Sequence, residues 1–495
     1  MAQHERSGDA AGQPAPGATP LAGRVSPGSS AWGRRLAYSA GGILDEWGLH
    51  GLKNSANPVF NIVLGINPAV VGSIMAFSRL WDAWTDPVMG SITDNARTRW
   101  GRRRPFIAVG AVLCALTFLP LWIIPGGMGT EAVYAWIIIA SLAFYTAFTI
   151  FSVPYHALAY EIAPDYHEKT KLLGVRMIFS TVSMFGVAWI FPFTQAGWFG
   201  SPENSVRVLA IIVALVVLVS GLLPALLMKE NAKEIAAVKR QRQVPLREGL
   251  GIAMRSGPFV RLLFAAGLTV VGLNMINALG TYVNVYHVHG GDARAASIIG
   301  GWGGTLYGVT VLAVTPGLVW LAKKIGKRNA LMVCFGCALV GTVSKWWLYT
   351  PNYPWLQLGV TVMLAPGMTG LWMLSESMVA DVSEYEQINS HVRTEGTYGA
   401  VYSWFLKSGL AFGVFVSGLI LVWTGFDVAK GPIQAPETVL WLRFFFAFVP
   451  AVAIIAAMLV LARFPLTPER MAEVRAELNR RTQTDAESSA LSNHE

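Results

Sequence analysis

Long apolar segments alternate along the chain with short polar segments. Each apolar segment is long enough to cross a bilayer, which takes about 20 helical residues. The pattern therefore predicts an all-α membrane protein with twelve membrane-spanning helices, at residues 36–62, 67–94, 105–125, 132–161, 172–195, 206–228, 258–288, 296–322, 329–349, 354–386, 397–424 and 437–463.

The connections between the spans indicate two halves of six helices each. A short basic loop with a glycine, residues 94–105, follows the second span, and a similar one, residues 323–328, follows the eighth. Duplicated halves with a site between them are typical of secondary transporters. We expect a disordered tail at residues 1–35, halves at 36–228 and 258–463 joined by a basic linker at 229–257, and a second tail at 464–495.

Composition and charge agree with a membrane protein. Hydrophobic residues make up 53% of the chain and charged residues 14%, and the formal net charge is +9. Lysine and arginine concentrate on the even-numbered connections, which predicts that these loops and both termini face the cytoplasm. Topology and contact with anionic membrane lipid explain the charge, so nucleic-acid binding is not needed, and we expect an inner-membrane protein.

Two aspartates, Asp82 and Asp86, lie one turn apart inside the second predicted span. Their side chains share a helix face at about 6 Å, where adjacent carboxylates repel unless a proton or cation joins them. Carboxylates at bilayer depth are costly and mark a functional site by default. The pair predicts a site for Na⁺ or H⁺, and no other metal site is expected. The alternative is a structural ion pair with Arg79.

Cations also occur inside predicted spans. Lys407 and Arg176 must each be neutralised locally or face water, and an aspartate of the pair is the natural partner for Lys407. If Lys407 exchanges between carboxylate and substrate, it couples cation release to substrate movement. A static salt bridge is the alternative. Glu376 lies one turn from Trp372 and could bind substrate hydroxyls or a proton.

Enzyme signatures are missing from the sequence. It contains no H-E-x-x-H helix, no G-x-S-x-G elbow and no phosphate-binding P-loop. The Cys334–Cys337 pair lies in an apolar span, and we expect it to pack there, without metal or redox chemistry. A membrane enzyme with a cofactor is therefore not expected.

Two motifs carry a resemblance to a known family. They are Asp82-Ala-Trp-Thr-Asp-Pro-Val-Met-Gly90, continued by Ser91-Ile-Thr-Asp-Asn-Ala-Arg-Thr-Arg-Trp-Gly-Arg-Arg-Arg-Pro105, and Met378-Val-Ala-Asp-Val-Ser-Glu-Tyr385. The chain resembles the glycoside–pentoside–hexuronide:cation symporters of the major facilitator superfamily, which include melibiose permease. The resemblance implies the twelve-helix major facilitator fold, a monomer, and symport of a sugar with Na⁺ or H⁺ by alternating access.

The resemblance also implies residue roles. Asp82 and Asp86 match cation-site carboxylates, and Thr85 stands where melibiose permease has an asparagine ligand, which leaves the choice between Na⁺ and H⁺ open. On the substrate side the matching positions are Glu46, Ser152, His156, Arg176, Trp372, Ser403 and Lys407.

Three positions on the substrate side depart from melibiose permease. Ser152 replaces an acidic residue, His156 a tryptophan and Asp45 a lysine. The loss of an acid, with Arg176 and Lys407 retained, suits an anionic sugar such as a uronide. Asp45 and Glu46 suit the opposite charge, so the charge of the substrate stays open. A lipid or other amphiphile, or passive facilitation, are the alternatives to coupled sugar transport.

Charged residues near the cytoplasmic ends of the spans are expected to form the ion pairs of an inner gate, which break when the site opens inward. The predicted gate residues are Arg99, Arg102, Arg103, Asp381, Glu384 and Arg393.

Overall fold

The computed structural model describes residues 31–162, 166–228, 251, 254–390, 395–427, 430–431, 433–474, 476–477 and 480. Several predictions lie outside these residues. They concern most of the tail 1–35, most of the linker 229–257, the gate residue Arg393 and the end of the second tail.

The first half contains the helices up to residue 227. They are α1 (Ala31–Glu46), the π-helical turn η1 (Trp47–Gly51), α2 (Leu52–Ala56), the π-helical turn η2 (Asn57–Val63), α3 (Pro68–Asn95), α4 (Arg104–Trp122), α5 (Thr130–Ile162), α6 (Tyr166–Ala188), α7 (Ile190–Gln195) and α8 (Pro202–Leu227). The continuous stretch from α1 to η2 corresponds to the first predicted span, and it begins at Ala31 where the sequence placed the start at residue 36.

The second half contains the remaining helices. They are α11 (Gly257–Tyr282), the π-helical turn η3 (Val283–Val288), α12 (Ala293–Ile325), α13 (Lys327–Leu348), the short 3₁₀ turn η4 (Pro354–Leu356), α14 (Gln357–Ser390), α15 (Glu395–Trp423) and α16 (Pro436–Ala462). Ten helices of the described chain are long and apolar enough to cross a membrane. With the α1–η2 segment, which carries Glu46, and α3, which carries Asp82 and Asp86, the described helices are consistent with the twelve spans that the sequence predicts.

Polar caps fix where several of these helices begin. Asn67, Ser201, Ser256 and Asp292 each accept a hydrogen bond at their side-chain oxygen from a backbone N–H in the first turn, and proline occupies an early position after the first three. Such caps satisfy N–H groups that have no partner within the helix. They place the helix starts within the short polar connections between the apolar segments.

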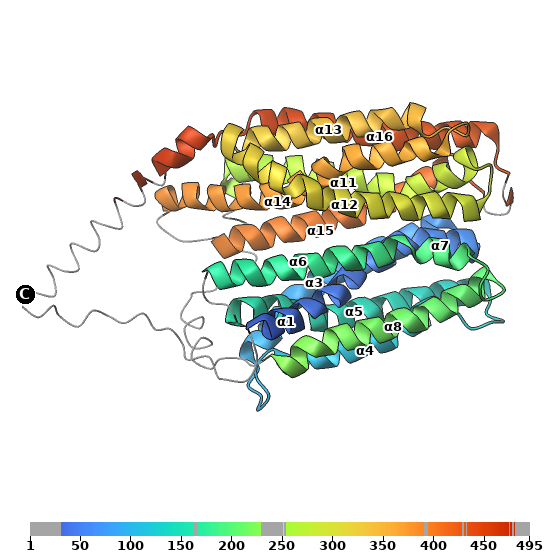
Figure 1. The fold of residues 1–495 in the computed structure, drawn as a ribbon, viewed down its shortest axis with the longest axis horizontal. Helices are drawn as coiled ribbons and strands as arrows, with labels where there is room; N and C mark the ends of the chain where they lie inside the picture. The colour runs from blue at the N-terminus through green and yellow to red at the C-terminus, as the bar shows by residue number, and fades with distance from the viewer. Residues whose placement is uncertain are drawn as a thin grey trace, which may run out of the picture.

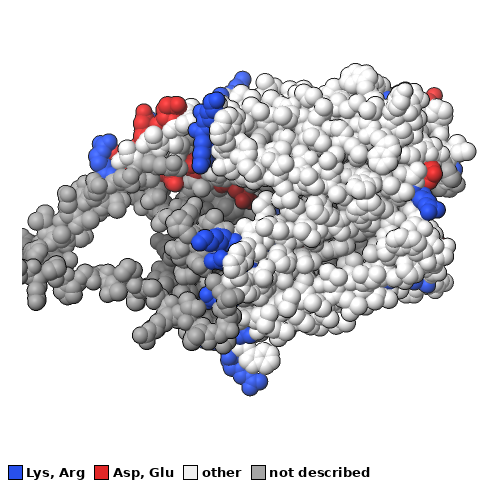
Figure 2. Space-filling view, viewed as in Figure 1, with Lys and Arg blue, Asp and Glu red and all other residues white. Residues whose placement is uncertain are grey.

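Each half has its own hydrophobic core. One cluster packs α1, α4, α5 and α8 together, and a second packs α11, α13, α14, α15 and α16. The halves lie side by side with their helices running along the same long direction (Figure 1). Lysine and arginine gather at the ends of the bundle, whereas its middle shows an almost uncharged surface (Figure 2). Such an uncharged belt suits the hydrocarbon layer of a membrane.

The two halves meet along α3 and α15, and along α6, α7 and α12. Glycines of α12 allow a close approach, and a Cβ added to Gly304 would lie 2.4 Å from that of Ala188. Trp189 Nε1 donates a hydrogen bond of 2.9 Å to Thr305 Oγ1 across the same junction. These residues lie in the first half of α12, far from Lys323 and Lys324 at its other end. We call the end of the bundle with Lys323–Arg328 and the α3–α4 loop the basic end. The contact of α12 with α6 and α7, which we call the seal, lies toward the opposite end.

Candidate functional site

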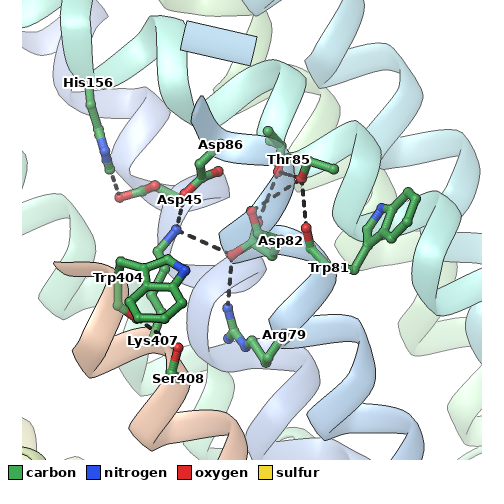
Figure 3. A network of polar contacts seen from close by, with 11 residues as sticks. Asp45, Arg79, Trp81, Asp82, Thr85, Asp86, His156, Trp404, Lys407 and Ser408 are labelled. Atoms are coloured by element: carbon green, nitrogen blue, oxygen red, sulfur yellow. Dashed lines mark hydrogen bonds and ion pairs between the residues drawn. The ribbon is translucent and has the colours of Figure 1, made fainter. Parts of the chain in front are cut away.

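The two aspartates of α3 face Lys407 of α15, so the site joins the two halves (Figure 3). Lys407 Nζ lies 3.3 Å from Asp82 Oδ2 and also donates a hydrogen bond to Asp86 Oδ2. Asp82 is 0% exposed, whereas the side chains of Asp86 and Lys407 are 24% and 23% exposed. The structure thus places the ammonium of Lys407 on both carboxylates at once.

Two threonines complete the oxygen atoms of this cluster. Thr149, on α5, donates a hydrogen bond of 3.0 Å to Asp82 Oδ1 and lies 3.1 Å from the Thr85 hydroxyl. The Thr85 hydroxyl donates to the carbonyl of Trp81 or of Asp82 within its own helix. Asp86 Oδ1 is buried and accepts no hydrogen bond among the described residues. Carboxylate and hydroxyl oxygens so close together can ligate a hard monovalent cation or hold a proton.

Arg79 supplies a second positive charge to the cluster. Its Nη1 lies 3.9 Å from Asp82 Oδ2, and its guanidinium lies 4.9 Å from the centre of the Tyr145 ring. It also donates a hydrogen bond to the carbonyl of Leu49 in η1. The structural pairing that the sequence offered as an alternative is therefore present alongside the Lys407 contacts. Two carboxylates and two cations balance one another here.

A second charged cluster forms around Asp45 of α1. Its Oδ2 accepts a hydrogen bond of 2.5 Å from Arg176 Nη2 of α6 and lies 3.1 Å from His156 Nε2 of α5. Arg176 Nη2 is also 2.9 Å from His156 Nε2, and its guanidinium is 5.5 Å from the centre of the Tyr155 ring. The structure thus brings together two predicted substrate residues with an acid at the position of a lysine in melibiose permease.

A cavity of about 880 Å³ lies between the halves, next to this second cluster. Four predicted substrate residues line it: Glu46, Arg176, Trp372 and Glu376. The other four lie outside its lining. Of these, His156 contacts Arg176, Ser152 is buried, Ser403 is exposed, and Lys407 is held by the aspartates.

Three of the predicted gate residues make contacts within their own half of the protein. Asp381 pairs with Lys327 of its own half, at 2.7 Å. Arg103 Nη1 donates a hydrogen bond of 2.5 Å to Thr93 Oγ1, and Arg99 lies over the Trp100 ring at 5.6 Å. Arg102 is buried and Glu384 is half-buried. An ion-pair gate between the halves stays a prediction.

Several site residues escaped sequence reasoning. Thr149 lies in an otherwise apolar span, where a lone threonine gives no signal of a carboxylate partner. Tyr307 lines the cavity from α12 without any motif around it. Asp45 was recognised as a departure from melibiose permease, but its pairing with Arg176 depends on how α1 and α6 pack.

Comparison with known proteins assigns the fold to a family. A family model described as MFS/sugar transport protein matches residues 51–468. The chain belongs to this family of membrane transporters. The isoprimeverose transporter of Lactiplantibacillus pentosus is 25% identical over 395 residues, which cover 79% of this chain and 80% of the relative. The glucuronide carrier protein homolog of Escherichia coli is 24% identical over 459 residues, covering 91% and 96%.

A solved structure shows the same fold. The crystal structure of a D-xylose–proton symporter superposes with a TM-score of 0.63 at 14% identity, covering 89% of this chain and 99% of that one. The predicted resemblance to the glycoside–pentoside–hexuronide:cation symporters and the all-helical major facilitator fold are confirmed. The expectation that the chain is a transporter and not an enzyme is confirmed by the same family match.

Proposed function

We propose that this transporter couples the uptake of a glycoside or related sugar to the binding of Na⁺ or H⁺ at Asp82 and Asp86. The observation that carries the proposal is the position of Lys407, whose ammonium contacts both carboxylates from the opposite half. Relatives named for sugar transport support the substrate class. A lipid or amphiphile is less favoured, because the relatives reported above are named for sugars and because Glu46, Arg176 and Glu376 give the largely apolar cavity the polar groups that a sugar needs.

Exchange of Lys407 for a cation gives the coupling step. A cation that binds Asp82 and Asp86 competes with the ammonium, because both satisfy the same negative charges. Release of Lys407 weakens the α3–α15 contact that joins the halves and frees them to rock. If cation binding raises sugar affinity, sugar binding raises cation affinity by the same factor.

The sugar binds in the cavity next to Arg176. Trp372 offers an apolar ring face for the C–H groups of a pyranose, and Glu46, Arg176 and Glu376 offer hydrogen-bond partners for hydroxyls. His156 acts on Arg176 from outside the lining. Ser152 and Ser403 are assigned to the substrate by the family resemblance alone.

The basic end faces the cytoplasm in this proposal, which puts both termini there and the protein in the inner membrane. The seal between α6, α7 and α12 then lies toward the outside, so the structure is closed to the outer face. A monomer is sufficient for this cycle. Ion pairs among Arg99, Arg102, Arg103, Asp381, Glu384 and Arg393 would form in the state closed to the cytoplasm.

Transport in proteoliposomes tests the proposal. A neutral glycoside should accumulate under an imposed Na⁺ or H⁺ gradient in the wild type, and accumulation should be lost in Asp86→Asn. The exposed acid Glu203, at the start of α8, provides the control Glu203→Gln, which should transport as the wild type does. If the glycoside instead equilibrates across the membrane without a gradient, and Asp86→Asn does not change this, the protein is a passive facilitator and its aspartate pair is structural.

A further inference from the structure

The charges that line the cavity are unequal in sign. Glu46 enters from α1 and Glu376 from α14, so a carboxylate from each half lines the same space. Neither forms an ion pair or a hydrogen bond with another described residue. Arg176 is the one arginine or lysine among the described lining residues, and His50 of η1, which is charged only when protonated, is the one histidine.

Arg176 is already neutralised. Asp45 Oδ2 accepts its hydrogen bond at 2.5 Å, and the Asp45 side chain is 9% exposed, so water screens this ion pair only weakly. The contact with His156 Nε2 at 2.9 Å occupies the same guanidinium nitrogen. Arg176 can still donate hydrogen bonds to substrate hydroxyls, but its positive charge is balanced before any substrate arrives.

Lys407, the other cation near the site, is also paired with carboxylates. Lys407 lies outside the cavity lining and contacts both Asp82 and Asp86. A carboxylate on a sugar would therefore enter the cavity without an uncompensated cation to pair with, and would lie near two further carboxylates. An unpaired anion removed from water is costly, whereas a protonated amine would find two unpaired acids.

We infer that the cavity selects a glycoside that carries a basic amino group over the neutral glycoside, and rejects a uronide. Asp45 sets this selectivity by neutralising Arg176, and Glu46 and Glu376 recognise the amine. The inference rests on the proposed function as a sugar symporter and specifies the substrate of that same site. It also resolves the question of substrate charge, which Arg176 and Asp45 leave open when only the sequence is known.

Uptake of three matched probes tests the inference. They are a neutral methyl hexoside, the corresponding amino-sugar glycoside and the corresponding methyl uronide, each measured in proteoliposomes under the driving gradient. The amino glycoside should have the lowest KM, and the KM of the uronide should exceed that of the neutral probe at least about tenfold. A uronide KM equal to or below the neutral one, or an amino glycoside that competes no better than the neutral one, would overturn the inference.

A gain of function gives the sharper test. Asp45→Asn removes the charge that balances Arg176, so the KM of the uronide should fall at least about tenfold while that of the amino glycoside rises. Asp292→Asn is the matched control, because asparagine also caps a helix and Asp292 lies at the start of α12 outside the cavity lining. Glu46→Gln and Glu376→Gln should each reduce the preference for the amine without creating uronide uptake.

The outcomes separate the two proposals. If none of the three probes accumulates with either gradient, the proposed sugar symport fails and the inference fails with it. If the neutral probe accumulates but the uronide is preferred, symport stands and only the charge selectivity is wrong. If Asp45→Asn does not fold, the wild-type ranking of the three probes still decides.

Discussion

Replacing Lys407 with methionine tests whether the ammonium competes with the coupling ion. The change keeps most of the apolar stem and removes the charge that contacts Asp82 and Asp86. Both carboxylates then remain near Arg79 alone, whose Nη1 is 3.9 Å from Asp82. We therefore expect Lys407→Met to bind the coupling ion more tightly than the wild type, and to lose gradient-driven accumulation.

The magnitude follows from burial. Removing one partner of a buried ion pair costs about 3–5 kcal/mol, because the other charge is left uncompensated. Asp82 is fully buried, but Asp86 and Lys407 are partly exposed, so the lower limit applies. A bound cation recovers this cost in the variant, whereas in the wild type it must first displace the ammonium. About 3 kcal/mol corresponds to a rise in cation affinity of about a hundredfold.

Calorimetric titration of purified protein with Na⁺, and a parallel pH titration of stability without Na⁺, measure this affinity. The matched control is Lys345→Met, since Lys345 is also a buried lysine, in α13, and contacts the ring of Phe446 at 4.3 Å and its carbonyl oxygen at 3.4 Å. The control should leave ion affinity unchanged. Unchanged or weaker ion binding in Lys407→Met would refute the competition and leave a static salt bridge.

Two further changes test the ion site and the seal. Thr149→Val removes the hydrogen bond to the buried carboxylate and should weaken ion binding about tenfold in the same titration, while Thr146→Val, one turn away, should not. Equal effects would contradict the ligand role. Gly304→Leu places atoms where α6 already packs and should open the seal, whereas Gly317→Leu, also on α12 but outside the cavity lining, has free space. Labelling of a Thr361→Cys cavity cysteine by an impermeant thiol reagent added outside should rise only with the former, and no rise would disprove the steric seal.

The fold followed from the sequence because hydropathy determines it. A chain in a bilayer must satisfy every backbone hydrogen bond internally, so each long apolar segment becomes a helix. The α1–η2 segment and α3 are not among the ten most apolar helices, but their length and apolar content still predicted them as spans. The contact between the halves at Gly304 could not be predicted, because a glycine is compatible with either a close or an open packing of α6 and α12.

The ion site was partly predictable for a similar reason. Charges at membrane depth must pair, so Asp82, Asp86 and Lys407 could be expected to meet although 321 residues separate the last two. The contact of Thr149 with Asp82 could not be expected, because a neutral hydroxyl inside the membrane does not need a charged partner. The pairing of Asp381 with Lys327 shows the limit of the argument. When several cations lie near one end of a bundle, charge alone does not say which one an acid will contact.

Asp45 and Glu46 are adjacent in the sequence, but the helix α1 points their side chains in different directions. Successive residues point about 100° apart around a helix. Asp45 therefore reaches Arg176 on α6, while Glu46 lines the cavity. The two neighbouring acids thus have different surroundings: Asp45 pairs with Arg176, and Glu46 faces the space that we propose for the substrate. A sequence motif that contains both cannot distinguish them.

Arg79 connects the ion site to this same segment. Its guanidinium lies near Asp82 and donates a hydrogen bond to the carbonyl of Leu49, in the π-helical turn that directly follows Glu46. A cation on the aspartate pair weakens the attraction of Asp82 for Arg79, because both compete for the same negative charge. Through Arg79, cation binding at the aspartates therefore acts on the backbone of η1, next to the cavity carboxylate Glu46. Since linkage is reciprocal, a substrate that draws Glu46 into the cavity acts on the affinity of the aspartates through the same arginine.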